Sequence, residues 1–573
     1  MKGRILVSSQ WFKAILGLAA ALALLIVVFV SQGPKLLLEF PLLIKIISQL
    51  RDPIGSFHPV VWESGPEFAA NSTTDSAVQR SPNIVYILVD DLGWNDLSWN
   101  GGGVAGGRVP TPNIDSLAQD GVEFTMGYAG NATCAPSRAA LLTGRYPQRF
   151  GFESTPAPPA MGRLSAEMGN AGLTEGAPRT LFHEDRIDEV PPMEEQGVPG
   201  SEITIAELLQ EGGYQTLMLG KWHLGDTDGK LPSDQGFDQF LGFENGGSLF
   251  GLDEDPEIIS AKNPSDPIDK IVWQLLPFAV RMNKGQRFEP DLYMTDYLSR
   301  EAVRAIEANR HRPFFLYLAY NAPHNPLQAT REDYEALSDI EDHTTRVYGA
   351  MIRSLDRGVG DVLDALRDNG LEENTLVVFT SDNGGAHYIG VPELNDPYRG
   401  WKMTFFEGGI HSPFFVKWPA RLPAGEQRGT PVSHFDLFAT AAAAAQVPLP
   451  SDREIDGIDL IPFATGVVDA ETREALFWRS HGLKVVLCAG WKLQVDERQE
   501  KRWLYDLASD PTERHNLAET RTDKLSELQA LLDAHDAEIG SKSFPSLVEG
   551  VIPVDRHGMQ PYVPGEEFQY WPN

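Results

Sequence analysis

The stretch IVYILVDD, residues 84–91, decides the fold class of this 573-residue chain. Six consecutive apolar residues form a run of strand length, and the run stops at two adjacent carboxylates, Asp90 and Asp91. A continuous apolar run, unlike an alternating one, indicates a strand that is buried on both faces. Such strands are typical of a parallel sheet that is covered by helices on both sides.

Three further apolar runs have the same form, and each ends in polar residues. They are TLMLGKWH at 216–223, FFLYLAYNAPH at 314–324 and LVVFTSDNGG at 376–385. Helical patterns lie between the runs, over 114–120, 203–211, 295–309 and 345–369. This alternation predicts an α/β fold, an open doubly wound arrangement with a large, mostly parallel mixed sheet sandwiched by helices.

The polar strand ends predict one shared site, because ligands of doubly wound sheets bind beyond the carboxyl ends of the strands. Asp90, Asp91, Asp382 and Asn383 offer carboxylate and amide oxygens, which suit calcium or magnesium rather than zinc. Without a cation, clustered carboxylates would repel one another and their pKa values would rise. For either pair alone, turn-forming residues after a strand are the alternative interpretation.

Basic side chains follow the other strands. Lys221 and His223 lie two residues apart and face the same way in an extended segment. His324 lies in a loop bounded by prolines and can reach the same edge of the sheet. Lys402, within RGWKMTFFEGG at 399–409, is a further candidate cation.

The segment CAPSRAALLTGR, residues 134–145, places a cysteine at the start of a predicted helix. Thr133 or Ser137 can cap this helix. Free N–H groups and the helix dipole favour an anion at its N-terminus. We therefore interpret Cys134 as an activated residue beside an anion cradle, with Arg138 one turn later; an inert buried thiol is the alternative.

The pattern Cys-x-Pro-x-Arg followed by Leu-Leu-Thr-Gly-Arg resembles the signature of the type I sulfatases of the alkaline phosphatase superfamily. The resemblance spans roughly residues 82–520. It implies an arylsulfatase-like sulfuric ester hydrolase that cleaves sulfate monoesters. It also implies that Cys134 is oxidised to formylglycine, whose hydrate is the nucleophile. A formylglycine-generating or equivalent maturation enzyme would then be a partner.

The same resemblance implies a metal site with one calcium ion. The implied ligands are Asp90, Asp91, Asp382, Asn383 and the modified Cys134. A sulfate oxygen would complete the coordination.

The remaining site residues also match the family pattern. Lys221 and Lys402 would bind the sulfate, and Arg138 would steady the formylglycine. His324 would protonate the leaving group, and His223 would lie beside the formylglycine.

Two positions depart from the family pattern. The segment NGG at 245–247 stands where some relatives offer a serine near the site. His411 ends the segment GGIH, where the family has arginine, so a titratable group replaces a fixed cation.

The charge of the chain restricts its partners. Lys and Arg number 48 against 80 Asp and Glu, which gives a net charge of −32. Nucleic acid is therefore excluded as a partner, because its phosphates require clustered cations. An anionic substrate must meet a local positive pocket. We expect a singly or sparsely sulfated ester of a carbohydrate or an aryl alcohol rather than a dense polyanion.

The N-terminus predicts export. Lys2, Arg4 and Lys13 precede an apolar run over 14–30, near the lower length limit of a membrane span. We expect an uncleaved anchor whose catalytic part lies in the periplasm or outside the cell, with a cleaved signal peptide as the alternative. The segment 35–50 is either a helix packed on the body or an interfacial helix on the membrane.

Composition divides the chain into four parts. We expect an anchor or signal over 1–33, a membrane-proximal helix and linker over 34–80, a catalytic domain over 81–430, and a C-terminal subdomain and tail over 431–573. The last part should contain a smaller antiparallel sheet and an amphipathic helix over 522–539.

Substrate specificity would lie on two insertions and the tail. Residues 153–200 form either a pocket rim or a disordered insertion, and residues 252–290 contain either a membrane-facing patch or a docked helix. Aromatic residues of these segments can stack on a sugar or aryl ring or be buried against the body: Trp273, Tyr562, Phe568, Tyr570 and Trp571.

Two other functions stay open at this point. One is a phosphonate or phosphodiester hydrolase of the same superfamily, some members of which share the cysteine motif. The other is a catalytically silent, membrane-anchored protein that only binds an anion. The complete nucleophile motif argues against the second, because binding alone needs no nucleophile.

Overall fold

The computed structural model describes residues 50, 52–65, 80–171, 173–263, 267–468, 473–539, 544–556 and 560–573. The predicted span over 14–30 and all but the last residue of the segment 35–50 lie outside these residues. In the part of the chain that the structure describes, no helix has the length and apolar character needed to cross a membrane.

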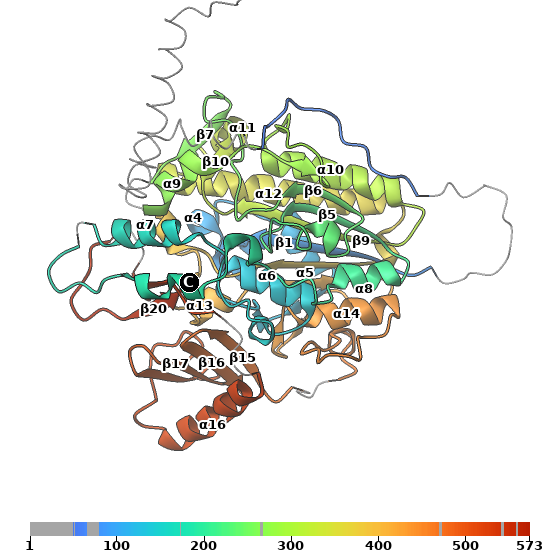
Figure 1. Cartoon of the computed structure of the whole chain (residues 1–573). Coiled ribbons are helices and arrows are strands. Elements are labelled where there is room, and N and C mark those ends of the chain that lie inside the picture. Colours follow the sequence, from blue (N-terminus) through green and yellow to red (C-terminus); the bar gives the residue numbers. More distant parts are fainter. Residues whose placement is uncertain are drawn as a thin grey trace, which may run out of the picture.

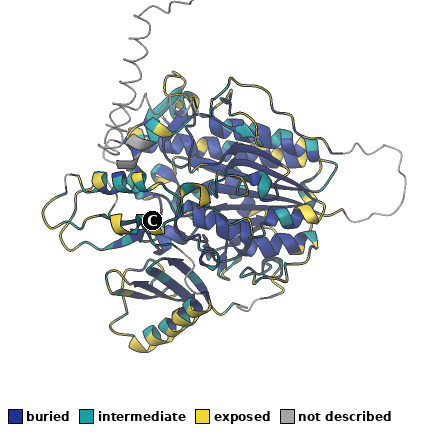
Figure 2. Cartoon of the chain, in the orientation of Figure 1, coloured by how far each residue is buried: buried dark blue, intermediate teal, exposed yellow. Residues whose placement is uncertain are grey.

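A nine-stranded sheet runs through the centre of the molecule (Figure 1). In spatial order its strands are β13 (Glu426–Arg428), β2 (Val122–Phe124), β12 (Phe414–Lys417), β11 (Thr375–Ser381), β1 (Asn83–Asp90), β9 (Phe314–Pro323), β5 (Gln215–Lys221), β6 (Gln239–Phe243) and β8 (Arg281–Met282). The five strands from β11 to β6 are parallel, and β12 and β8 flank them antiparallel. Every residue of β1, β5, β9 and β11 is buried, as the apolar runs predict (Figure 2).

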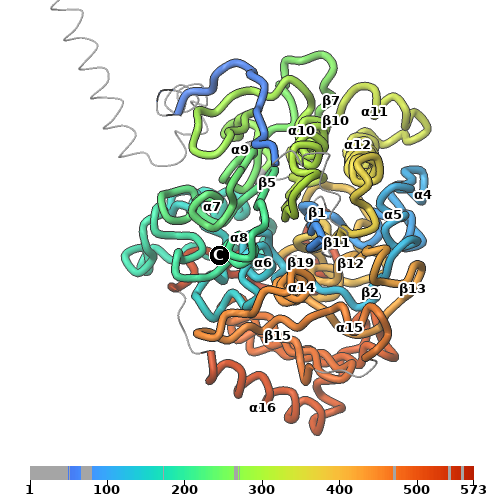
Figure 3. The backbone as a smooth tube through the Cα atoms, turned by 90° about the vertical axis from the view of Figure 1, so that its right-hand side faces the viewer, coloured from blue at the N-terminus to red at the C-terminus, as the bar shows by residue number. Residues whose placement is uncertain are grey.

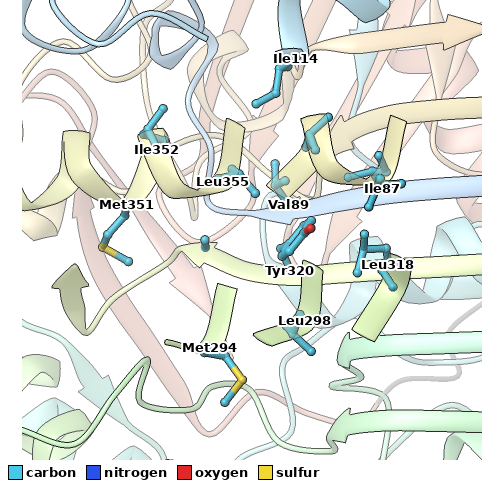
Figure 4. Packing of buried hydrophobic residues seen from close by; sticks show 14 of the residues in the cluster. Ile87, Val89, Ile114, Met294, Leu298, Leu318, Tyr320, Met351, Ile352 and Leu355 are labelled. Carbon is cyan, nitrogen blue, oxygen red and sulfur yellow. The ribbon is translucent and has the colours of Figure 1, made fainter. Parts of the chain in front are cut away.

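Helices cover both faces of this sheet (Figure 1). On one face lie α5 (Pro112–Gln119), α10 (Met294–Asn309) and α12 (His343–Asp368), and on the other α6 (Cys134–Thr143), α8 (Ile205–Glu211) and α14 (Asp436–Ala445). Alternate residues of β1 pack on opposite faces, because side chains alternate along a strand. Ile87 and Val89 pack toward α10 and α12 (Figure 4), and Tyr86 and Leu88 pack toward the other layer. The predicted α/β class is confirmed.

The smaller C-terminal sheet is also confirmed, and it lies at one end of the molecule (Figure 1, Figure 3). Its antiparallel strands are β15 (Leu476–Ser480), β16 (Leu483–Cys488), β17 (Trp491–Asp496) and β18 (Lys501–Asp506), and α16 (Thr522–Ile539) packs on one face. The other face packs against the body, where Phe405 and Phe406 belong to the same buried cluster. The division of the chain into four domains stays a prediction.

The first insertion and the end of the chain share a third sheet. β19 (Val548–Pro553) pairs antiparallel with both β4 (Leu181–Phe182) and β20 (Phe568–Pro572). Within the two insertions, α7 (Pro159–Gly169) contacts α9 (Pro267–Leu275). The alternative of a disordered insertion over 153–200 is therefore wrong for its described residues, and the second insertion contains a docked helix.

A buried ionic network joins the C-terminal sheet to the body. Lys492 Nζ of β17 lies 2.7 Å from Glu407 Oε1 and 3.0 Å from Glu513 Oε1. His411 Nδ1 lies 2.9 Å from Glu407 Oε2, and its Nε2 lies 2.9 Å from the carbonyl oxygen of Thr125. Both ring nitrogens thus face hydrogen-bond acceptors, and the imidazole links Glu407 to the backbone that follows β2.

We expect Lys492→Met to lower the free energy of unfolding by about 3–5 kcal/mol, because it leaves two buried carboxylates without their cation. Urea unfolding measures this loss. The matched control is Lys284→Met, which removes a surface ion pair with Asp234 and should leave the free energy of unfolding almost unchanged, because solvent screens exposed ion pairs. Equal losses in the two variants would contradict the structural role of the network.

Candidate active site

The predicted strand ends meet at one edge of the large sheet. β11, β1, β9 and β5 are adjacent and parallel, so the residues that follow them emerge on the same side. Helix α6 begins beside this edge with Cys134. The structure thus brings together residues from segments that lie up to about three hundred positions apart, as in the 291-residue separation of Asp91 and Asp382.

The acidic residues form one cluster. Asn383 Nδ2 donates to Asp91 Oδ1 at 2.7 Å, and the Asp91 N–H donates to Asp382 Oδ1 at 3.2 Å. Adjacent strand residues normally point to opposite faces. Asp91 instead has a left-handed backbone, with φ of +63°. This turn lets the carboxylates of Asp90 and Asp91 face the same site.

The donor set fits a hard metal ion. Asp90, Asp91, Cys134 and His324 each offer a ligand atom, and these atoms lie within 4.8 Å of one another. Asn383 Oδ1 is buried and accepts no hydrogen bond from any residue that the structure describes. A site of carboxylate and amide oxygens suits calcium or magnesium. Two of the four predicted oxygen ligands, Asp90 and Asp91, belong to this group, and the other two, Asp382 and Asn383, are hydrogen-bonded to Asp91.

Two lysines pair with the carboxylates. Lys221 Nζ donates to Asp90 Oδ2 at 2.7 Å, and Lys402 Nζ donates to Asp91 Oδ2 at 2.8 Å. Lys402 Nζ also lies 3.3 Å from Cys134 Sγ. Burial alone would raise the pKa of Asp90, but Lys221, His324 and Arg138 together outweigh it, and the pKa falls to about 2. Burial also opposes the lowering of the Asp91 pKa, but Lys402 and His324 together outweigh it.

Arg138 is fully buried and connects several strand ends. Its Nε and Nη2 lie 2.9 and 2.8 Å from Asp382 Oδ2, and its Nη1 donates to the carbonyl oxygen of Lys221 at 2.9 Å. Nη2 lies 3.6 Å from Asp90 Oδ1. Burial and the nearby Asp90 raise the pKa of Asp382, although Arg138 opposes this shift. These contacts, both with the same carboxylate oxygen, hold the Asp382 side chain toward the acidic cluster.

Cys134 begins α6 as predicted, but its thiol is not activated. Burial raises the thiol pKa, and this effect exceeds the opposing effect of Lys221 and Lys402. A protonated thiol is a poor nucleophile. The predicted side-chain caps are also wrong: Thr133 occupies the N-cap position, but its hydroxyl contacts Asn131 instead. The Ser137 hydroxyl accepts from the N–H of Gly130, outside the helix.

The two predicted histidines lie at the same site. His324 Nδ1 lies 2.6 Å from the carbonyl oxygen of Asn325, so it carries the proton, and Nε2 lies 3.5 Å from Asp91 Oδ2. Burial lowers the pKa of His324, although Asp91 opposes the shift. Burial and Lys221 lower the pKa of His223 well below its ordinary value. His223 is therefore neutral at neutral pH.

The departure at residues 245–247 has a steric explanation. A Cβ added to Gly246 would lie 2.7 Å from His223 Nε2. A side chain at this position would displace the imidazole, so Gly246 leaves the space that His223 occupies.

Sequence reasoning missed Tyr388 and the groups that hold it. Its hydroxyl lies 3.4 Å from Asp91 Oδ2, and its ring centroid lies 5.9 Å from Lys402 Nζ. Its carbonyl oxygen accepts from Asn263 Nδ2 at 2.9 Å, which joins the second insertion to the site. Tyr388 follows no strand directly and belongs to no charged motif, so local sequence gives no signal for it.

His434 was also missed. Its Nδ1 lies 3.0 Å from Ser137 Oγ of α6, and its Nε2 lies 3.2 Å from Thr380 Oγ1 of β11. The imidazole thus holds the nucleophile helix against the central sheet.

Comparisons with known proteins point to one family. The family model described as Sulfatase matches residues 82–447. The chain is 33% identical over 441 residues to N-acetylgalactosamine-6-sulfatase of Rattus norvegicus, covering 75% of this chain and 74% of that protein. Steryl-sulfatase of Rattus norvegicus is 30% identical over 557 residues, covering 79% and 88%. The crystal structure of Ps i-CgsB in complex with k-i-k-neocarrahexaose matches with a TM-score of 0.65 and 31% identity, covering 81% of this chain and 95% of that one.

The buried His434 predicts a pH dependence of stability. Burial lowers its pKa from 6.5 to about 3, so the unfolded chain binds a proton that the folded chain does not. The free energy of unfolding should therefore fall as the pH drops from 6.5 toward 3, by up to about 1.4 kcal/mol per pH unit from this group. We expect His434→Gln to show a shallower fall in urea unfolding across this range. His515→Gln, at an exposed position, should keep the wild-type slope; equal slopes in all three proteins would contradict the prediction.

Proposed function

The chain belongs to the sulfatase family and is a sulfatase, and we propose that it hydrolyses sulfate monoesters of carbohydrates with a formylglycine made from Cys134 and one calcium ion. The observation that carries this proposal is the position of Lys402. Its Nζ lies 3.3 Å from Cys134 Sγ and 2.8 Å from Asp91 Oδ2. The ammonium group of Lys402 therefore contacts both Cys134, the proposed nucleophile, and the acidic cluster.

Cys134 requires chemical conversion in this proposal, because its buried thiol stays protonated. An external maturation enzyme would oxidise the residue, replacing the thiol by an aldehyde oxygen. The hydrated aldehyde carries two hydroxyls on one carbon, and one of them would attack sulfur with Asp382 nearby. Arg138 would hold Asp382 in place through its contacts with Asp382 Oδ2.

The cations of the site would stabilise the sulfate. Lys221 and Lys402 are fixed by Asp90 and Asp91, and they would meet the negative charge that develops on the sulfate oxygens. Calcium, when bound by Asp90, Asp91, Asp382 and Asn383, would add the charge stabilisation of a Lewis acid.

The histidines would move protons. His324 Nδ1 is fixed by a backbone carbonyl, which leaves Nε2 facing the site. In the imidazolium form, which a bound anionic ester would favour, Nε2 also carries a proton and would donate it to the leaving alcohol. His223 has a strongly lowered pKa, so it is a neutral base. It would accept the proton of the second hydroxyl as sulfate leaves.

Sugar substrates are favoured over aryl substrates by the names of two similar proteins, N-acetylgalactosamine-6-sulfatase and Ps i-CgsB in complex with k-i-k-neocarrahexaose. Export and a membrane anchor are supported by sequence alone, through the cationic N-terminus and the apolar run over 14–30. The acidic surface gives no support to a nucleic-acid partner.

Mass spectrometry of the tryptic peptide that contains Cys134 tests the nucleophile. In active enzyme we expect this residue to have lost sulfur and two hydrogens and gained one oxygen. Cys134→Ala should lower kcat by about a thousandfold or more while calcium still raises the melting temperature. Cys488→Ala is the matched control and should keep full activity. An unmodified thiol in active enzyme would refute the proposal.

The ratio of two rates tests the reaction class. We expect faster turnover of 4-nitrophenyl sulfate than of bis(4-nitrophenyl) phosphate at equal concentrations, because one hard cation and two lysines suit a sulfate monoester. A chelator should abolish both activities, and added calcium should restore them. Faster turnover of the phosphate diester would instead identify a phosphodiesterase, and no turnover of any sulfate ester by modified enzyme would identify a silent binding protein.

A further inference from the structure

A cavity of about 270 Å³ lies where the first insertion, the C-terminal sheet and the end of the chain meet. Three separate segments contribute its lining. Its polar and aromatic residues are Arg186, His481, Asp496, Arg498, Ser546, Glu549 and Tyr570. None of these residues belongs to the active site described above.

The charges of this cavity are balanced. Arg498 Nε lies 3.1 Å from Glu549 Oε2, and Arg186 Nη1 lies 3.8 Å from Glu549 Oε1. Asp496 accepts hydrogen bonds of 2.9 and 2.7 Å from the turn that follows β17. With two guanidinium groups and two carboxylates, the cavity has no excess positive charge to attract a sulfate group.

The lining instead suits an uncharged ligand with hydroxyl groups. Carboxylates accept and guanidinium groups donate hydrogen bonds, and such groups can pair with hydroxyls without a net charge. Tyr570 adds a half-buried aromatic ring, with Arg498 Cζ 5.7 Å from its centroid. The neighbouring Trp571 points the other way along β20 and is buried against Phe405, with ring centroids 5.2 Å apart. Phe568 is also half-buried, but Tyr570 is the aromatic residue of this strand that lines the cavity.

The cavity is connected to the nucleophile by a short path. The carbonyl oxygen of Arg479 accepts from Asn131 Nδ2 at 3.3 Å. Asn131 lies three residues before Cys134, and Arg479 lies two residues before His481 of the cavity. Five residues of extended backbone span at most about 18 Å, and the Asn131 side chain with its hydrogen bond adds roughly 10 Å to this upper bound. An oligosaccharide of several units can cover this distance.

We propose that this cavity is a saccharide subsite that binds an unsulfated sugar unit of an oligosaccharide substrate, several units from the sulfate ester that is cleaved. The inference rests on the proposed carbohydrate sulfatase function. It makes the end of the chain and the first insertion determinants of substrate length.

The test compares kcat/KM for 4-nitrophenyl sulfate and for sulfated galactose and N-acetylgalactosamine saccharides from one to six units. For wild type, kcat/KM should rise with saccharide length. Tyr570→Ala should lower kcat/KM for the hexasaccharide about tenfold, mainly through KM, because a buried aromatic contact is lost. The monosaccharide and the nitrophenyl ester, which do not reach the cavity, should change by less than about twofold. Tyr562→Ala is the matched control in the same tail and should leave all values unchanged.

An unchanged hexasaccharide value in Tyr570→Ala would overturn the subsite and leave the carbohydrate sulfatase function intact. An equal loss on the monosaccharide would also overturn it, because the effect would then come from the fold or the main site. If wild type cleaves the nitrophenyl ester but none of the saccharides, the carbohydrate function itself fails, and the subsite fails with it.

Discussion

The buried guanidinium of Arg138 is the interaction on which the geometry of the site depends. It reaches Asp382 after β11, the carbonyl oxygen of Lys221 at the end of β5 and, at 3.6 Å, Asp90 at the end of β1. Its own helix carries Cys134 one turn earlier. A planar guanidinium with five donors can hold these groups at once, whereas a lysine could not. Without it, Asp90 and Asp382 would face each other in a low-dielectric interior and repel.

The chain has a net charge of −32, so a site that binds an anion must supply positive charge locally. Three carboxylates, Asp90, Asp91 and Asp382, are matched by three cations at hydrogen-bond distance, namely Arg138, Lys221 and Lys402. The protein groups alone therefore come close to neutrality. A divalent cation in the acidic cluster would make the site positive, which an anionic ester requires. Metal binding and sulfate binding are thus expected to support each other.

Sequence predicts the site well where function follows a strand, because parallel strands deliver their ends to one edge. Asp90, Lys221, His324 and Asp382 were found in this way, and the structure places them together. Sequence predicts the site less well where tertiary packing determines the environment of a residue or the partner of a strand. The protonated state of the Cys134 thiol depends on burial. The sheet of β4, β19 and β20 joins short strands that lie more than three hundred residues apart, and no local pattern reveals such a pairing.

The segments that we expect to determine substrate specificity lie outside the sulfate-binding residues. Polar contacts nevertheless connect these segments to the site. The chain is similar both to a relative named for a sugar sulfate and to one named for a steryl sulfate, so similarity alone does not identify the alcohol. The two insertions can influence this choice, because each is linked by polar contacts to residues at or near the site. Asn263 of the second insertion donates to the carbonyl of Tyr388, and Glu153 of the first insertion pairs with Arg479 at 2.9 Å. Substitutions in these insertions would therefore alter the residues around the substrate, while Arg138 keeps the positions of Asp90 and Asp382 unchanged.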